Sequence, residues 1–388
     1  MISNLTKLSC LLIGTSFPMR LHTPIAFGAT LGLGILLIIF ENKNLIRLSI
    51  RNALSNKVFP ILLIFFSFFS ISTLFSIATF RSLLVEIYLF IFMFISYILF
   101  QFFKKNFTAL KLTINFCLIG ISFSTFLVFL FSIQNTLGLG IPTTLESTII
   151  GFEIQKYKGF VNLLTILVLI CPFLEKFLDH KRFVISFLLL ILLIPTILIS
   201  NCTSALLGII VGFLGLFYIK ILELFKSRKL KSLLTILLLT STSTTFLNLL
   251  PKNTFQINPD EIRFNIPTSA IDAHRQIIWG FSYQKMKERL FFGFGADSSN
   301  FISDSQKIIG HSQTGTMRFI PSHPHNFFIE LVLEIGLLGT FSFLLLILYV
   351  NYLNFINFEF SKYLVFFNFY FWGSSLVNFS FWTGWWQG

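Results

Sequence analysis

The chain has 388 residues, of which 55% are apolar and only 12% are charged, and its mean hydropathy is +0.82. A soluble domain of this length has too little interior to bury so much apolar surface, so the composition excludes a soluble globular protein and predicts a lipid environment. The net charge of +13 lies mostly in short segments between apolar runs, which indicates membrane topology rather than nucleic-acid binding.

Apolar runs recur along the whole chain, and a spanning helix needs about 20 mostly apolar residues. We therefore predict an all-α polytopic membrane protein with about 11 (10–12) transmembrane helices. Lys7 and the apolar run after it also resemble a secretory signal, but the cleavage pattern is missing, which favours a first membrane helix. In chain order the predicted helices are 5–19, 22–40, 58–80, 83–103, 112–133, 159–174, 183–200, 204–219, 232–250, 326–350 and 363–384.

Basic residues mark one side of the predicted membrane. Four loops carry clusters of lysine and arginine, and counting helices puts all four on the same side, which the positive-inside rule makes cytoplasmic. The two longest polar segments, 134–158 and 251–325, then lie on the opposite side. The four clusters are Lys43, Arg47, Arg51 and Lys57; Lys104, Lys105 and Lys111; Lys176, Lys181 and Arg182; and Lys220, Lys226, Arg228, Lys229 and Lys231.

Residues 251–325 divide the chain into a helix bundle of about nine helices (1–250), one large outer loop (251–325) with short helices and catalytic residues, and C-terminal helices (326–388). Loops of this length are usually functional or disordered, and the aromatic residues and glycines of this one favour order. Its basic residues lie on the side that normally has few positives, which indicates an anionic ligand. They are Lys252, Arg263, Arg275, Lys285, Lys287, Arg289, Lys307 and Arg318.

Within this loop, helical spacing of apolar residues predicts an amphipathic helix from Ser269, its cap, to Leu290, followed by the breaker Phe291-Phe-Gly-Phe-Gly-Ala. Its basic residues Lys285, Lys287 and Arg289 are interpreted as a solvated face. Arg81 and Glu86, near the outer end of a predicted helix pair, either form a structural pair or line a ligand site. Trp382, Trp385 and Trp386 are interpreted as an interfacial aromatic belt.

The strongest chemical signal is the string that starts Ser322-His323-Pro-His325-Asn326 and continues through Glu330 and Glu334 to Gly336 and Gly339. Two histidines stand where the long loop enters a membrane helix, and Asn326 can cap that helix. Asn326, Glu330 and Glu334 are spaced at i, i+4 and i+8 and share one helix face. Acidic residues inside a membrane helix are functional candidates, whereas a lone interfacial histidine is often only a polar tip.

This string resembles the signature of the O-antigen ligase and polymerase superfamily of bacterial membrane glycosyltransferases, where it also follows a large periplasmic loop. Upstream, Arg275, Trp279 and Phe291-Phe-Gly293-Phe-Gly295 resemble the family's arginine–tryptophan–Gly-x-Gly pattern, and Lys158-Gly159 resembles a further basic position. One position departs from the pattern: Thr203 stands where family members often carry an arginine before a helix that begins Ser/Thr-Ala-Leu-Leu-Gly.

The resemblance implies a protein of the bacterial inner membrane whose periplasmic active site moves a glycan from an undecaprenyl-diphosphate carrier to an acceptor sugar hydroxyl, such as that of lipid A–core. It implies His325 as the catalytic base with His323 second, and Arg275 holding the diphosphate, in one inverting displacement. Asn326, Glu330, Arg263 and Trp279 are expected to bind substrate, and Lys156 or Lys158 to replace the missing arginine. We expect no metal, cofactor or nucleic acid; membrane lipid is the other partner.

Several functions remain open at this point. An O-antigen polymerase uses the same donor chemistry as a ligase, so the catalytic residues do not separate the two, and a protein O-oligosaccharyltransferase is a third glycan-transferring alternative. A polysaccharide or lipid transporter is the alternative from another class. Transporters tend to show internal repeats and helices broken at mid-membrane, and the sequence shows neither, which favours an enzyme.

Overall fold

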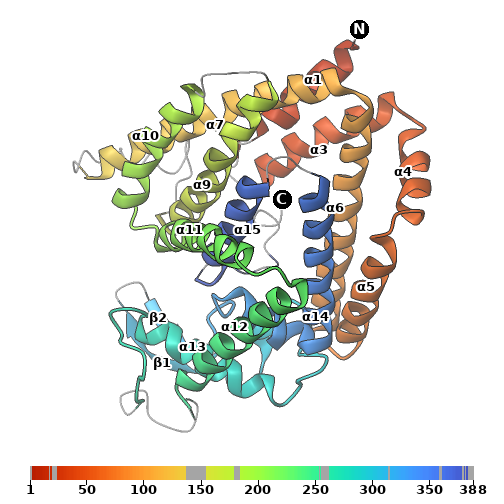
Figure 1. The fold of residues 1–388 in the computed structure, drawn as a ribbon. Coiled ribbons are helices and arrows are strands. Elements are labelled where there is room, and N and C mark those ends of the chain that lie inside the picture. The colour runs from red at the N-terminus through yellow and green to blue at the C-terminus, as the bar shows by residue number, and fades with distance from the viewer. Residues whose placement is uncertain are drawn as a thin grey trace. The chain divides into compact units, whose positions relative to one another are not determined.

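The computed structural model describes residues 2–16, 18–19, 24–136, 154–178, 184–252, 254, 262–312, 315–357, 361–377, 380 and 382. These residues are mostly helical and form two compact units (Figure 1). Unit 1 comprises Met1–Asn56, Ile91–Val211 and Phe367–Ser374, and unit 2 comprises Lys57–Phe90, Gly212–Phe366 and Ser375–Gly388. The division of the chain into 1–250, 251–325 and 326–388 concerns the order of segments across a membrane and stays a prediction.

Unit 1 is a bundle of helices around an apolar core. α1 (Asn4–Gly14) packs against α3 (Pro24–Glu41) and α7 (Phe107–Thr136), and α7 packs against α9 (Ile154–Phe177) and α10 (Val184–Ile199). The short α4 (Leu45–Leu54), the C-terminal part of α6 (Thr79–Lys105) and the N-terminal part of α11 (Thr203–Glu223) complete it. Gly14 permits the close approach of α1 to α7, because a Cβ there would lie 2.4 Å from the Phe116 Cβ.

Unit 2 holds α5 (Phe59–Leu74), α12 (Arg228–Leu249), α13 (Ala273–Met286), the 3₁₀ helix η3 (Ser299–Phe301) and α14 (Phe327–Asn357). α14 packs against both α5 and α13 (Figure 1). α15 (Ser361–Ser375) contributes residues to both units. The outer-loop segment also contains an antiparallel hairpin of β1 (Ile308–Ser312) and β2 (Gly315–Arg318), so the prediction of an all-α fold missed one small sheet.

Each of the eleven apolar segments predicted as a membrane helix contains a helix. Among the described residues, however, five helices are long and apolar enough to cross a membrane, or six if the pair Ala26–Glu41 and Leu45–Leu54, bent by 96°, is one span. Shorter apolar helices such as Phe59–Leu74 and Val184–Ile199 fall below this length. The protein is therefore a helical, multi-pass membrane protein, whereas the figure of about 11 spans and the outer-loop orientation stay predictions.

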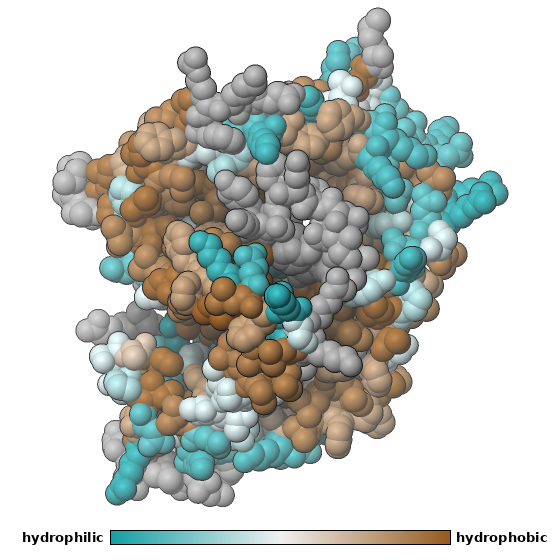
Figure 2. Space-filling view, viewed as in Figure 1, coloured by the Kyte–Doolittle hydropathy of each residue, from teal (hydrophilic) through white to brown (hydrophobic). Residues whose placement is uncertain are grey.

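The spanning helices differ in how much protein covers them. In the apolar stretch of α6, only 11% is buried, and α6 carries exposed residues such as Leu84 and Phe90. In the apolar stretch of α14, by contrast, 56% is buried, which makes α14 an internal helix of unit 2. Figure 2 shows hydrophobic residues over much of the visible face, as expected for side chains that contact lipid rather than water.

α14 is interrupted at Gly336, which has φ 68° and ψ −178°, a conformation that essentially only glycine adopts. The turn at 290–295 fills the break: the amides of Phe294 and Gly295 donate to the carbonyls of Leu333 and Glu334 at 3.0 and 2.7 Å. In return, the amide of Leu337 donates to the carbonyl of Leu290 at 2.9 Å. The loop thus satisfies backbone groups that a broken membrane helix would leave unpaired. The sequence-based expectation of unbroken helices is wrong here.

Candidate functional site

The loop helix α13 places Arg275 in its first turn. It begins at Ala273 and ends at Met286, so the predicted limits Ser269 and Leu290 are wrong at both ends. Asp272, rather than Ser269, is the cap: its side chain accepts from the Arg275 amide at 3.0 Å. The same carboxylate lies 3.4 Å from the Arg275 Nε, in a half-exposed ion pair. Arg275 is therefore fixed at both its backbone and its side chain while part of its guanidinium remains accessible.

Trp279 ties α13 to the histidine string. Its indole Nε1 donates to the carbonyl of Pro324 at 2.8 Å, and its buried ring packs near Phe246 with centroids 5.5 Å apart. Pro324 stands between the two histidines, so this bond joins the helix that carries Arg275 to both. Gly280 allows the close packing of α13, because a Cβ there would lie 2.4 Å from the Pro251 carbonyl oxygen. Trp279 thus positions the site from within the protein.

The two histidine rings lie side by side, with centroids 4.1 Å apart and planes tilted by 55°. The Nδ1 of His323 is 2.8 Å from the Ser322 hydroxyl, whereas its Nε2 is buried and has no hydrogen-bond partner among the described residues. His325 has φ 56°, a left-handed conformation that is uncommon for a residue other than glycine. Such strained backbone clusters at functional sites.

The electrostatic surroundings keep both rings neutral at pH 7. Burial is the largest cause that lowers the pKa of His325 to about 4; the Arg275 guanidinium and the His274 ring act in the same direction and Asp272 opposes them. Burial and the neighbouring His325 hold the pKa of His323 well below its usual range. Arg275 acts on the pKa of His325 although 49 residues of chain separate the two.

His274 is a member of this site that the sequence reasoning missed. Its Nε2 lies 2.8 Å from the Arg318 carbonyl oxygen at the end of β2, so it links α13 to the hairpin. A histidine directly before the predicted arginine was the available signal. Arg263, predicted to bind substrate, is exposed in the segment that leads to α13. Lys156 and Lys158 lie in α9 of unit 1, with side chains outside the described residues, so their predicted role is untested.

Asn326 caps α14 as predicted, its Oδ1 accepting from the Ile329 amide at 3.1 Å. Its Nδ2 donates to the Leu376 carbonyl at 3.1 Å. One turn further along the same face, the buried Glu330 accepts from the Ser380 hydroxyl, and after another turn Glu334 accepts from the Trp382 indole. The chain after α15 therefore runs along the predicted face. The predicted last helix, 363–384, instead ends at Ser375.

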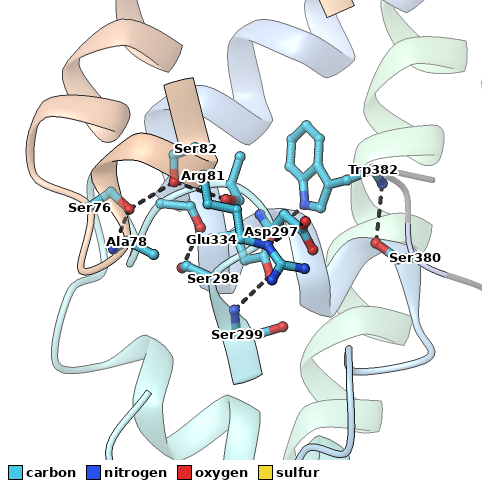
Figure 3. Close-up of polar contacts among 12 residues, drawn as sticks. Ser76, Ala78, Arg81, Ser82, Asp297, Ser298, Ser299, Glu334, Ser380 and Trp382 are labelled. Carbon is cyan, nitrogen blue, oxygen red and sulfur yellow. Dashed lines mark hydrogen bonds and ion pairs between the residues drawn. The ribbon is translucent and has the colours of Figure 1, made fainter. Parts of the chain in front are cut away.

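Glu334 organises the turn before η3 (Figure 3). Its fully buried carboxylate accepts from the amides of Asp297 and Ser299 at 2.5 and 3.0 Å, in addition to the Trp382 indole. Both oxygens are thus occupied by donors from the protein. The structure gives this predicted functional carboxylate a supporting role. Trp382 is buried rather than part of an interfacial belt, while Trp385 and Trp386 lie outside the described residues.

The first turn of α6, together with the α5–α6 connection, holds the other side of this turn (Figure 3). Arg81 Nε lies 2.7 Å from Asp297 Oδ2, and the Ser82 hydroxyl donates to the Ala296 carbonyl at 2.8 Å. Arg81 therefore does not pair with Glu86, which instead accepts from the Thr73 hydroxyl at 2.8 Å and from Ser70. Gly295 allows this contact, because a Cβ would lie 1.9 Å from the Ser76 hydroxyl oxygen.

The predicted solvated face of Lys285, Lys287 and Arg289 is confirmed for two residues and wrong for one: Lys287 and Arg289, just after α13, are exposed, whereas Lys285 is not. Lys285 is buried and its ammonium lies 2.8 Å from Glu288 and 3.2 Å from the Ser303 hydroxyl. Arg289 donates to the Phe75 carbonyl at 2.7 Å and lies over the Phe294 ring. These contacts hold the end of α13 against the turn that fills the α14 break. Among the described residues, no group of histidine, cysteine, aspartate and glutamate is arranged to hold a metal ion.

Comparison with known proteins covers this part of the chain. Residues 187–344, which include Arg275, both histidines and Glu334, match the family model described as O-antigen ligase. The predicted family resemblance is confirmed. Curated relatives from Rickettsia prowazekii and Rickettsia typhi carry the name "Putative polysaccharide ligase". The first is 29% identical over 52% of this chain and 48% of the relative, and the second is 26% identical over 66% and 64%.

A relative from Rickettsia conorii with the same name is 28% identical over 52% of this chain and 47% of its own length. The matched segments thus cover between about half and two thirds of the length of these curated relatives. No solved structure matches it significantly. The likeness to O-antigen ligase thus lies in the part of the chain that holds Arg275, both histidines and Glu334.

Proposed function

We propose that this protein transfers a glycan from an undecaprenyl-diphosphate carrier to a sugar hydroxyl of an acceptor such as lipid A–core, on the periplasmic face of the bacterial inner membrane. The reaction is a single inverting displacement that uses protein side chains rather than a metal ion. The observation that supports it best is the bond from the Trp279 indole to the Pro324 carbonyl, which joins the helix of Arg275 to the neutral His325 within the region that matches the family.

Arg275 is suited to the diphosphate of the donor. Arginine remains charged at all relevant pH values, and its planar fork pairs with two phosphate oxygens at once. The Asp272 carboxylate lies only at the Nε edge, at 3.4 Å, and the side chain is one third exposed, which leaves the guanidinium accessible to a ligand. The negative charge that develops on the leaving diphosphate would be stabilised here.

His325 is suited to the role of base because it is neutral and therefore able to accept a proton. A base with a pKa of about 4 is weak, but that value describes the site without its anionic donor. A bound diphosphate offsets the positive charge of Arg275, which is one cause of the low pKa, and so raises the pKa of His325. Donor binding would thus strengthen the base at the moment that it is needed.

The proposed step balances as follows. The acceptor hydroxyl oxygen forms a bond to the anomeric carbon while its proton passes to His325. The bond from the anomeric carbon to the phosphate oxygen breaks, and its electron pair leaves with the undecaprenyl diphosphate, held by Arg275. His325 then releases its proton to solvent. The configuration of the anomeric carbon is inverted because the two oxygens lie on opposite sides of it.

One observation favours the transporter alternative: α14 is broken at Gly336, and broken membrane helices are common at transport sites. In transporters, unwound backbone groups face a substrate cavity. Here the groups around Gly336 are hydrogen-bonded to the turn at 290–295 and to Ser72, whose hydroxyl donates to the Glu334 carbonyl at 3.1 Å. The break is filled by protein, which favours the enzyme. Polymerase and protein O-oligosaccharyltransferase activities use the same donor chemistry and stay alternatives.

Lipopolysaccharide gels of a deletion strain test this function, with complementation by wild type, His325→Ala and Arg275→Ala. We expect both variants to lose capped lipid A–core while polymer accumulates on its lipid carrier. A single repeat unit on the core would indicate a polymerase instead. A normal ladder from the deletion strain would rule out lipid A–core as the acceptor, and transfer by His325→Ala at the wild-type level would overturn the assignment of the base.

A further inference from the structure

One ring nitrogen of His323 has a hydrogen-bond partner in the protein, and the other has none among the described residues. Ser322 lies 2.8 Å from Nδ1, and the Ser322 side chain is exposed. Nε2 is buried and has no hydrogen-bond partner among the described residues, although buried polar atoms nearly always have one. In a site that receives a polar substrate, such an atom is a position where a ligand completes the hydrogen bonding.

The ring contact between the two histidines indicates which substrate meets this nitrogen. The His323 ring lies beside the His325 ring, with centroids 4.1 Å apart. Under the proposed function, His325 takes the proton of the acceptor hydroxyl, while Arg275 holds the leaving diphosphate on the opposite side of the anomeric carbon. A group that binds Nε2 of His323 therefore lies next to the acceptor hydroxyl.

We propose that His323 is the acceptor-binding residue, donating a hydrogen bond from Nε2–H to a hydroxyl of the acceptor sugar next to the one that His325 deprotonates. Ser322 donates its hydroxyl proton to Nδ1 and so holds the ring in the tautomer that carries its proton on Nε2. No bond to His323 forms or breaks during the reaction. The inference rests on the proposed function and assigns a second, non-basic role within the same site.

This role separates the two histidines by what can replace them. A glutamine side-chain amide is also a neutral N–H donor and reaches about as far as the Nε2 of histidine, so it can supply the same hydrogen bond. It cannot accept a proton near neutral pH. Glutamine should therefore substitute for His323 and fail to substitute for His325.

Steady-state transfer by the full-length protein in liposomes tests this proposal, with undecaprenyl-diphosphate-linked O-antigen as donor and lipid A–core as acceptor. We expect His323→Ala to raise the KM for the acceptor about tenfold, the effect of losing one hydrogen bond, with the donor KM and kcat nearly unchanged. His323→Gln should restore the acceptor KM to within about twofold of wild type, and Ser322→Ala should raise it about two- to threefold. The matched control His325→Gln should lose kcat.

If His323→Ala and His323→Gln both lose kcat, the proposal is overturned and His323 is a base. A raised donor KM in either variant would also overturn it, because His323 would then lie on the diphosphate side. Size-exclusion chromatography of each variant shows whether it remains folded, and His323→Gln keeps the test decisive if the alanine variant does not. If the wild type transfers nothing between these two lipids, the proposed function itself fails, and this inference fails with it.

Discussion

Two polar clusters lie within twelve residues of each other at the start of α14, and they differ in whether their polar atoms have partners. At Glu334 both carboxylate oxygens accept hydrogen bonds from the Asp297 and Ser299 amides and the Trp382 indole. At the histidine pair, Nε2 of His323 has no hydrogen-bond partner in the part of the chain that the structure describes, and both residues are only partly buried. We call a cluster saturated when its polar atoms have hydrogen-bond partners within the protein, as at Glu334. We interpret a saturated cluster as support for the fold, and a cluster with unpartnered polar atoms as a place where substrate can bind.

The distinction matters because the sequence made the two clusters look alike. An acidic residue inside a membrane helix is a functional candidate by default, as is a histidine pair at its entrance. The structure separates them through segments remote in sequence: the turn at 297–299, the α5–α6 connection and the chain after α15.

The largest effect is expected from Gly336→Ala, at the centre of the saturated region. Alanine would have to adopt a glycine-only conformation, and its Cβ would lie 2.2 Å from the Phe291 carbonyl oxygen. Strain of about 1–3 kcal/mol and the displaced backbone should together prevent accumulation of folded protein. Size-exclusion chromatography in detergent measures this. Gly32→Ala is the matched control, since a Cβ at Gly32 meets nothing within 4 Å, and it should accumulate normally.

His325→Ala should have the next largest effect, and it should act on catalysis alone. Loss of a general base typically costs about 10² to 10⁴ in rate. Alanine relieves little of the backbone strain at φ 56°. We therefore expect the free energy of unfolding to change by no more than about 1 kcal/mol. A transfer assay and a thermal-retention curve on the same preparation measure both quantities. Retained activity, or loss of folded protein, would erase the contrast with Glu334.

Glu334→Gln should have the opposite profile, because it puts an amide –NH₂ group where the carboxylate accepts from backbone amides. At least one buried donor loses its acceptor, at a cost of about 1–3 kcal/mol. We expect a lower value for the temperature at which half of the protein remains folded in detergent. Activity per folded molecule should fall only as far as the turn at 297–299 is displaced. Glu223→Gln is the control, since that side chain is exposed at the end of α11 and its substitution should change the temperature little.

The pH dependence of kcat/KM should show the state of His325 in the free enzyme. With a pKa of about 4, the ring stays neutral and competent to accept a proton down to about pH 5, so activity should fall only as the pH approaches 4. The acid limb of kcat should lie at higher pH, since bound diphosphate raises this pKa. The same depressed pKa makes the folded state lose stability as the pH falls from about 6.5 towards 4, because the unfolded chain binds the proton first. Coincident acid limbs would contradict the role of the donor charge.

The smallest effect is expected at the exposed rim of the saturated region. Arg81 and Asp297 form an ion pair at 2.7 Å, but their side chains are 44% and 28% exposed. Such pairs contribute about 0–1 kcal/mol. A double-mutant cycle with Arg81→Met and Asp297→Asn, read as thermal retention, should give a coupling in this range. A larger coupling would mean that this pair holds the turn as strongly as Glu334 does.

Reading along the chain was enough to predict the membrane class, the approximate positions of the apolar helices, the cap at Asn326 and the resemblance to the O-antigen ligase family. These features depend on composition, on short-range spacing and on a contiguous string of residues, all of which are read directly along the chain. The loop helix was also predicted, but not its cap, because Ser269 and Asp272 are equally good capping residues and only the folded turn selects between them.

Which polar residues find partners within the protein could be learned only from the folded structure. Glu330, Glu334, Arg81 and Lys285 all find partners on other segments, through contacts that no local pattern specifies. The glycines show the same limit, although Gly293 and Gly336 are 43 residues apart. A Cβ on Gly293 would meet the backbone of Glu334 and Gly336, and a Cβ on Gly336 would meet the backbone of Phe291 and Phe292. Burial and hydrogen bonding depend on what the fold places opposite a residue. Propensity and periodicity describe a residue only through its neighbours in the chain.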